Sequence, residues 1–85
     1  MMDYVDYYFE HLGLKFTIFE DGELLCKNWQ RNVMEIYEMD DKEFEESLRE
    51  LLEYLHEEEP DTEYSITTLD WKFMVRKFSE IYGML

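Results

Sequence analysis

The segment from Asp40 to Pro60 has the pattern of a single amphipathic helix, which restricts how the rest of the chain can be arranged. Asp40 and Glu43 have the spacing of the N-cap and third helical residue of a capping box. Pro60 ends the helix because its ring is incompatible with a further helical turn. The apolar stripe comprises Phe44, Leu48, Leu51, Leu52 and Leu55, and the opposite face carries Glu43, Glu46, Glu50, Glu53 and Glu57. The remaining chain must therefore supply an apolar surface that covers the stripe.

Most of the negative charge of the 85-residue chain lies in and around this helix. The segment Glu35–Glu63 holds fourteen acidic and two basic residues, so it carries −12 of the net charge of −14. Such a surface repels nucleic acid and anionic lipids, and we expect basic surfaces or cations as its partners. Disordered acidic tails contain few aromatic residues, whereas 18% of this chain is aromatic. We therefore expect a folded domain with one strongly anionic region.

The segment from Asp3 to Leu12 is predicted to form a short helix. Val5, Phe9 and Leu12 fall at helical spacing. Asp3 is suited to the N-cap position, and Gly13 is suited to the left-handed position that follows many helices. The tyrosines of this segment lie around its other side, so the helix would be apolar or aromatic on nearly every face.

The segment Leu14–Trp29 is predicted to form a β-hairpin. Asp21-Gly22 supplies the positive φ angles that a two-residue type I′ turn requires. This turn places Ile18 opposite Leu25. The core face would then carry Leu14, Phe16, Ile18, Leu25 and Trp29, and the other face Lys15, Thr17, Phe19, Leu24, Cys26 and Asn28.

The two segments that flank the central helix have less distinct sequence patterns. We expect a turn at residues 30–32 and a third strand at residues 33–39, where the chain alternates between two sets of side chains. After Pro60, the residues from Thr62 to Thr67 form either a short strand or an extended connector.

The last helix begins at a Thr67 or Thr68 cap. Asp70 is placed to complete a capping box with Thr67, and Gly83 is a suitable C-terminal cap. Its apolar face comprises Trp71, Met74, Val75, Phe78, Ile81 and Tyr82.

Together these elements predict an α+β fold in a single domain, residues 1–85. The expected architecture is a small antiparallel sheet with helices packed on one face, in the order helix, three strands, helix, helix. No apolar run approaches the ~20 residues that cross a bilayer, and the N-terminus lacks the pattern of a signal peptide. The single cysteine, Cys26, favours a reducing compartment. We therefore expect a cytoplasmic protein without a membrane partner.

Motifs for catalysis or cofactor binding are weak throughout the sequence. Glu53 and His56 have the Glu-x-x-His spacing of dimetal bundles, but the second copy that such sites require is missing. Cys26 lacks an orienting group that would make it a nucleophile. Each of the three glycines is explained by a turn or a cap. We predict a protein that is not an enzyme, has no metal or other cofactor, and does not bind nucleic acid directly.

The acidic helix face is the leading candidate for a binding site. Glutamates at steps of three and four residues lie ~5 Å apart along a helix axis. Phosphates lie ~7 Å apart along a DNA strand, so the linear charge density of the glutamate row is comparable to that of the strand. The candidate partner-binding residues are Asp40, Asp41, Glu43, Glu46, Glu50, Glu53, Glu57, Glu58, Glu59, Asp61 and Tyr54. The alternatives are that these acids are merely solvated, or that Lys72, Arg76 and Lys77 of the last helix neutralise part of them. Like charges at this spacing destabilise a helix, which favours a role in recognition.

In its size, its acidity and the composition of Glu35–Glu63, the chain resembles small inhibitor proteins of phages and mobile elements, which include anti-CRISPR, anti-restriction and other DNA-mimic proteins. The resemblance implies an inhibitor that occupies the basic nucleic-acid-binding surface of a partner in the host cytoplasm. That partner would be a CRISPR effector nuclease, a restriction enzyme or a DNA-repair enzyme.

A second hypothesis is a small structural or protein-interaction module whose acids are only solvated. It would bind through a secondary aromatic surface of Tyr4, Tyr8 and Phe73, either to another protein or to a second copy of itself as a homodimer.

Overall fold

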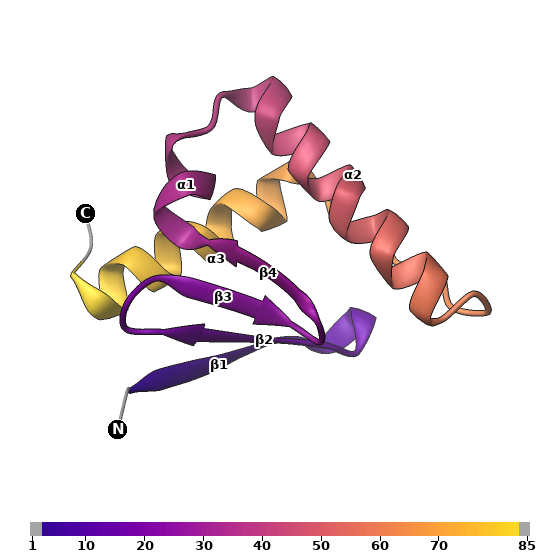
Figure 1. The fold of residues 1–85 in the computed structure, drawn as a ribbon, viewed down its shortest axis with the longest axis horizontal. Coiled ribbons are helices and arrows are strands. Elements are labelled where there is room, and N and C mark those ends of the chain that lie inside the picture. Colours follow the sequence, from indigo (N-terminus) through magenta and orange to yellow (C-terminus); the bar gives the residue numbers. More distant parts are fainter. Residues whose placement is uncertain (1–2, 84–85) are drawn as a thin grey trace.

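The computed structural model describes residues 3–83 and contains, within them, a four-stranded antiparallel sheet and three α-helices (Figure 1). The strands are β1 (Tyr4–Phe9), β2 (Leu14–Phe19), β3 (Glu23–Cys26) and β4 (Trp29–Asn32), and they neighbour one another in that order. A short 3₁₀ turn, η1 (Glu10–Leu12), joins β1 to β2. The helices are α1 (Val33–Glu38), α2 (Asp41–Glu58) and α3 (Thr68–Tyr82).

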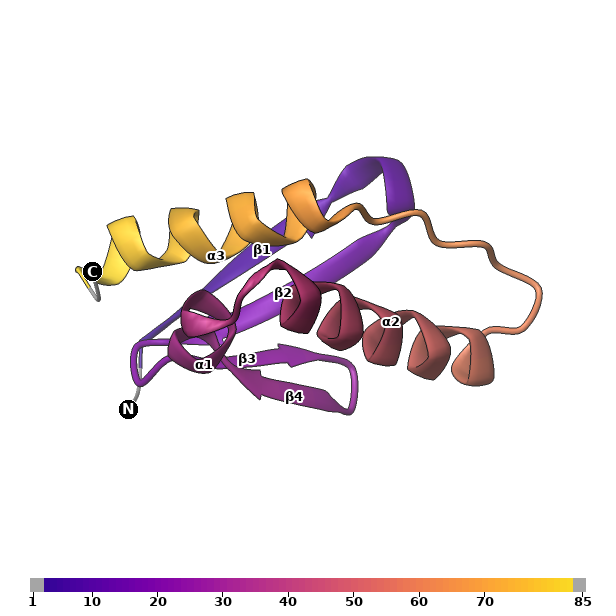
Figure 2. The same cartoon turned by 90° about the horizontal axis from the view of Figure 1, so that it is seen from above.

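The α-helices lie on one face of the sheet, which Figure 1 shows from the side and Figure 2 from above the helices. Among residues 3–83, no helix covers the other face in Figure 1. The predicted α+β class is confirmed. The predicted order of elements is wrong, because four strands come first and three helices follow.

The first segment is a strand, not the predicted helix. β1 pairs along its whole length with β2, from Tyr4 opposite Phe19 to Phe9 opposite Leu14. Val5 and Phe9 are four residues apart, a spacing that fits the helical period and the two-residue period of a strand equally well. Tyr and Val favour strands, and β2 offers an adjacent edge for pairing. Gly13 is left-handed as predicted, with φ 65°, but it follows η1.

The hairpin of β2 and β3 exists, but its predicted register is wrong by one residue. Ile18 pairs with Leu24, and three residues (20–22) connect the strands. Gly22 has φ 89°, and the Asp21 carboxylate accepts a hydrogen bond from the Glu23 amide at 3.0 Å. A slip of one residue reverses the faces of a strand. The core therefore contains Leu24 and Cys26, whereas the predicted core residue Leu25 lies on the open face of the sheet.

The predicted turn at residues 30–32 is a strand, and the predicted third strand is helix α1. The actual turn before β4 is Lys27-Asn28, in which Lys27 has φ 56°. Asn32 caps α1 by accepting a hydrogen bond from the Met34 amide at 2.9 Å. Val33 and Ile36 are fully buried one helical turn apart. Residues 62–67 form an extended connector without strand pairing among the described residues.

Both long helices begin at the predicted capping boxes. The Asp40 carboxylate accepts from the Glu43 amide at 2.9 Å, and the Thr67 hydroxyl accepts from the Asp70 amide at 3.1 Å. α2 ends before Pro60, and α3 ends at the left-handed Gly83. These local signals succeed because a cap satisfies backbone groups of the helix itself and needs no distant partner.

The helices share one core with the inner face of the sheet. Trp71 of α3 is fully buried, and its ring lies 5.6 Å from the rings of both Phe16 and Trp29. α2 contributes buried side chains from most of its predicted stripe, with Leu52 only half-buried. Ile81, which was assigned to the apolar face of α3, is 48% exposed, so that assignment is wrong.

Candidate partner-binding surface

The acidic row of α2 faces solvent because the opposite face of the helix is buried. Phe44, Leu48, Leu51 and Leu55 have exposed fractions of 6% or less. The row of Glu43, Glu46, Glu50, Glu53 and Glu57 is exposed along the whole helix, and so are Asp40, Asp41, Glu58 and Asp61. The core contacts thus fix the direction in which the glutamates point.

An acidic groove lies between α1 and α2, and we name it the α1–α2 groove. Its volume is about 600 Å³. Glu35 and Glu38 come from α1, and Glu43, Glu46 and Glu50 come from α2; Arg31, Met39 and Ser47 complete its lining. The sequence pattern did not predict this groove, because it placed Glu35 and Glu38 in a strand. The sequence pattern that indicates helix α1 is the cap residue Asn32 followed by apolar residues at positions 33 and 36.

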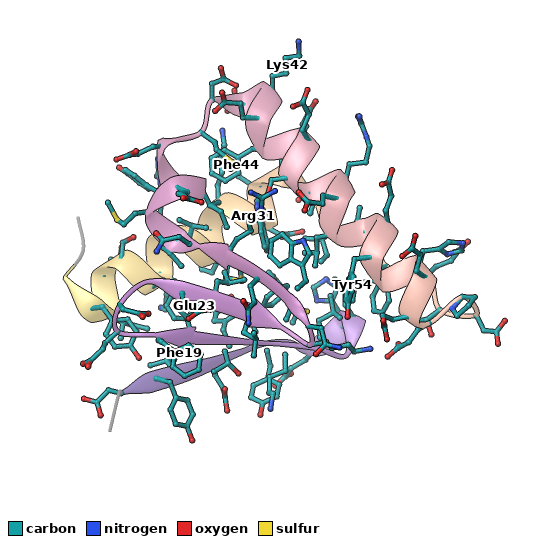
Figure 3. The ribbon with its side chains drawn as sticks, viewed as in Figure 1. Phe19, Glu23, Arg31, Lys42, Phe44 and Tyr54 are labelled. Carbon is teal, nitrogen blue, oxygen red and sulfur yellow. The ribbon has the colours of Figure 1, made fainter. Side chains whose placement is uncertain are left out.

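Three basic residues from other elements contact the acidic segment. Among the described residues, Arg31 of β4 pairs with Glu50, Lys72 of α3 pairs with Asp41, and Lys27 pairs with Glu59. These pairs reduce the net charge of Glu35–Glu63 from −12 to −9, so a strong negative field remains. Lys42 extends away from the body of the protein (Figure 3).

Glu59 and Tyr54 differ from the other predicted site residues. Glu59 is half-buried, and it also accepts a hydrogen bond from the hydroxyl of Tyr64. Tyr54 is half-buried against the core, and its hydroxyl has no partner among residues 3–83. The structure therefore places neither residue with the freely exposed carboxylates.

The predicted secondary aromatic surface is divided between two sides of the molecule. Tyr4 and Tyr8 are 57% and 58% exposed, and both project from β1 on the open face of the sheet. The ring of Phe19 lies 6.2 Å from that of Tyr4 and belongs to the same face. Phe73 is 55% exposed on the outer side of α3, next to the exposed Leu69. Tyr4 and Tyr8 therefore share a surface that excludes Phe73.

The described residues do not place Cys26 or any set of metal-ligating side chains in a second candidate site. Burial raises the pKa of the Cys26 thiol to about 11, so it remains protonated and a poor nucleophile at neutral pH. Within residues 3–83, no group of three or more His, Cys, Asp or Glu side chains is arranged to hold a metal ion. In the same range, no helix has the length and apolar character needed to cross a membrane.

Comparison of the chain with models of protein families, with curated proteins and with solved structures found no match.

Proposed function

We propose that this protein is a non-enzymatic inhibitor that binds the basic nucleic-acid-binding surface of a partner protein and excludes nucleic acid from it. The observation that carries the proposal is the exposed acidic row on α2, whose orientation is fixed by the buried face of the helix. Leu51 and Leu55 are fully buried directly behind it. Because the helix cannot rotate without exposing those leucines, the backbone positions of the five glutamates are fixed before binding, which reduces the part of the entropic cost of association that comes from ordering the backbone.

The dimensions of the row support this proposal. From Glu43 to Glu57 the helix rises about 21 Å, at 1.5 Å per residue. Glutamates repeat about every 5 Å along that length, which is comparable to the spacing of phosphates along a DNA strand. A channel lined with Lys and Arg would accept these carboxylates in place of phosphates. In view of the compositional resemblance described above, a CRISPR effector nuclease is the first target to test.

A capture experiment with matched variants tests the proposal. Immobilised wild-type protein is exposed to bacterial lysate in 50 mM salt and then eluted with duplex DNA. The charge variant replaces Glu46, Glu50 and Glu53 with Gln, which keeps the helix propensity nearly constant. The surface control replaces Tyr4 and Tyr8 with Ser. We expect DNA to elute a nucleic-acid-binding protein from the wild type and the surface control, but not from the charge variant.

The open face of the sheet supports a second candidate function, a protein-interaction module that binds either another protein or a second copy of itself. The exposed Tyr4 and Tyr8 and the half-buried Phe19 form an aromatic surface on one side of the sheet, and tyrosine is common in interfaces. Figure 3 shows Phe19 beneath the strands, away from the helices. Loss of capture in the Tyr4/Tyr8 variant, with binding retained in the charge variant, would favour this function over the acidic inhibitor.

A further inference from the structure

We propose that the open face of the sheet binds the same face of a second copy of the chain, with the two copies related by a two-fold axis that runs across the strands. The strand registers assign to this face the side chains of Tyr4, Asp6, Tyr8, Lys15, Thr17, Phe19, Glu23, Leu25, Gln30 and Asn32. The acidic row on α2 takes no part in this contact, so the proposal stands apart from the inhibitor function. It commits the open face to a second copy, whereas the second candidate function leaves the choice of partner open.

The two ends of the open face have complementary shapes. At the end formed by the start of β1 and the β2–β3 turn, Tyr4 is 57% exposed, and its ring lies 6.2 Å from that of the half-buried Phe19. At the other end, a hollow of about 390 Å³ lies between the start of β2 and the end of β3. Lys15, Thr17 and Leu25, whose side chains belong to the open face, are among its lining residues. A two-fold axis across the strands places the aromatic end of each copy over the hollow end of the other.

The charges of the two ends favour the same arrangement. The aromatic end carries Glu23 on the open face and Asp21 in the adjoining turn. The hollow end carries Lys15 and Lys27, with Glu10 in the neighbouring turn. Among residues 3–83, Lys27 pairs with an acid of the same chain, whereas Lys15 has no ion pair.

This distribution of charge distinguishes between the two directions of the axis. An axis parallel to the strands would set Glu23 and Asp21 of one copy against the same acids of the other, and like charges across an interface are unfavourable. An axis across the strands instead sets the unpaired Lys15 of each copy near the acids of its partner. The open face is therefore complementary to itself in one direction only.

The remaining charges allow two such copies to approach each other. The three α-helices of the described residues lie on the opposite face of the sheet (Figure 1), so most of the −12 charge of Glu35–Glu63 lies away from the contact. In the middle of the open face, the Thr17 hydroxyl donates to Oδ1 of Asp6 at 2.8 Å. This hydrogen bond partly satisfies a carboxylate that the contact would bury.

The area of the open face limits the affinity. Four strands of up to six residues span roughly 19 Å by 20 Å, at ~4.8 Å per strand and ~3.3 Å per residue. The projected area is thus about 400 Å², which is small beside the ~800 Å² of accessible surface that each partner buries in a stable complex. We therefore expect a reversible dimer with a Kd on the order of 100 µM.

Sedimentation equilibrium of the full chain in 150 mM salt tests the proposal. The apparent mass should rise from 10.6 kDa at about 5 µM towards twice that value at about 1 mM. Tyr4→Ser combined with Tyr8→Ser should raise the Kd at least about tenfold. The matched control combines Leu69→Ser with Phe73→Ser, which removes exposed apolar groups from α3 and should leave the Kd within about twofold of the wild type. Circular dichroism checks that both variants are folded.

Charge reversal tests the direction of the axis. Lys15→Glu alone and Glu23→Lys alone should each raise the Kd about threefold or more, because each sets like charges near one another across the contact. The double variant exchanges the two charges and should return the Kd to within about twofold of the wild type. An axis parallel to the strands predicts no loss of affinity in either single variant.

A wild-type protein that stays monomeric at about 1 mM, or equal Kd values for the tyrosine variant and the α3 control, would overturn the proposal. Unchanged affinity in the single charge variants, or a double variant that stays weak, would overturn the two-fold arrangement. These results are separable from failure of the inhibitor function. DNA-sensitive capture depends on the acidic row of α2, which lies on the opposite side of the sheet, and it would persist if only the dimer were wrong.

Discussion

Replacing Leu51 with Ala tests the packing that points the acidic row towards solvent. Leu51 is fully buried, and the neighbouring Leu52 is half-buried, so the same substitution at position 52 is a matched control. Removing three buried carbon groups costs about 2.4 kcal/mol at ~0.8 kcal/mol each. The cavity left behind raises the expected loss at Leu51 to about 3–5 kcal/mol. At Leu52, about half of the transfer term is lost and no closed cavity forms, which gives about 1 kcal/mol.

The measurement is equilibrium unfolding in urea followed by far-ultraviolet circular dichroism. A domain of this size has a total stability of about 4–13 kcal/mol, so the Leu51 variant should lose a large part of it. The slope of the unfolding free energy against urea should remain unchanged, because the surface exposed on unfolding is the same. An equal or greater loss at Leu52 would mean that α2 is rotated relative to the core. The glutamate row would then not face solvent, and the reasoning would fail.

Other predictions concern single local features. Asp40→Ala removes a cap that accepts from the Glu43 amide at 2.9 Å, and should lower the free energy of unfolding by about 0.5–2 kcal/mol in a urea titration. Cys26 should not react with a thiol reagent in the native protein at pH 8 and should react fully in urea. Burial raises the pKa of the Cys26 thiol to about 11 in the folded state. The stabilisation from the protonated Cys26 thiol should therefore be complete below pH 9 and should decrease as the pH rises towards 11. Thermal unfolding at several pH values would detect this decrease. At Lys27, where φ is 56°, a Val substitution should lower the stability by roughly 1 kcal/mol in thermal unfolding, because a β-branched residue tolerates the left-handed region less well than Lys does and the ion pair with Glu59 is lost. A Gly substitution should change stability by less than about 1 kcal/mol, because relief of backbone strain offsets the lost ion pair with Glu59; equal losses for Val and Gly would contradict this account.

The elements that could be predicted from the sequence are those with strong local chemistry. The capping boxes at Asp40 and Thr67, the break at Pro60 and the cap at Gly83 each satisfy or block backbone groups within one helical turn. The leucine stripe of α2 repeats over enough residues to distinguish a helix from a strand. These features located both long helices.

The errors arose where a short pattern fits two periods or where pairing decides the outcome. Val5 and Phe9 satisfy the spacing of a helix and of a strand, and only the pairing of β1 with β2 selects the strand. In the hairpin, the adjacent Leu24 and Leu25 are equally apolar, so the length of the turn alone determines which one is buried. At residues 33–39 the two alternating sets both mixed apolar and acidic residues, which is not the alternation that a half-buried strand requires.

The candidate site was predictable only in part. The exposed row of α2 follows directly from its helical phase. The α1–α2 groove also needs α1, which was not predicted, and Arg31, which the sequence assigned to a turn. Its partner Glu50 lies nineteen residues away, a distance over which local patterns carry no information about contact. The partition of Tyr4 and Phe73 onto different surfaces likewise depends on the sheet topology.

The most direct test of the central claim is the salt dependence of binding to a purified partner, with duplex DNA as a competitor. If the carboxylates of α2 replace phosphates on a basic surface, the affinity should fall at least about tenfold between 50 and 200 mM salt, because screening weakens contacts between exposed charges. Duplex DNA and this protein should also exclude each other from the partner. An affinity that is constant across this salt range, together with simultaneous binding of DNA and protein, would contradict the claim.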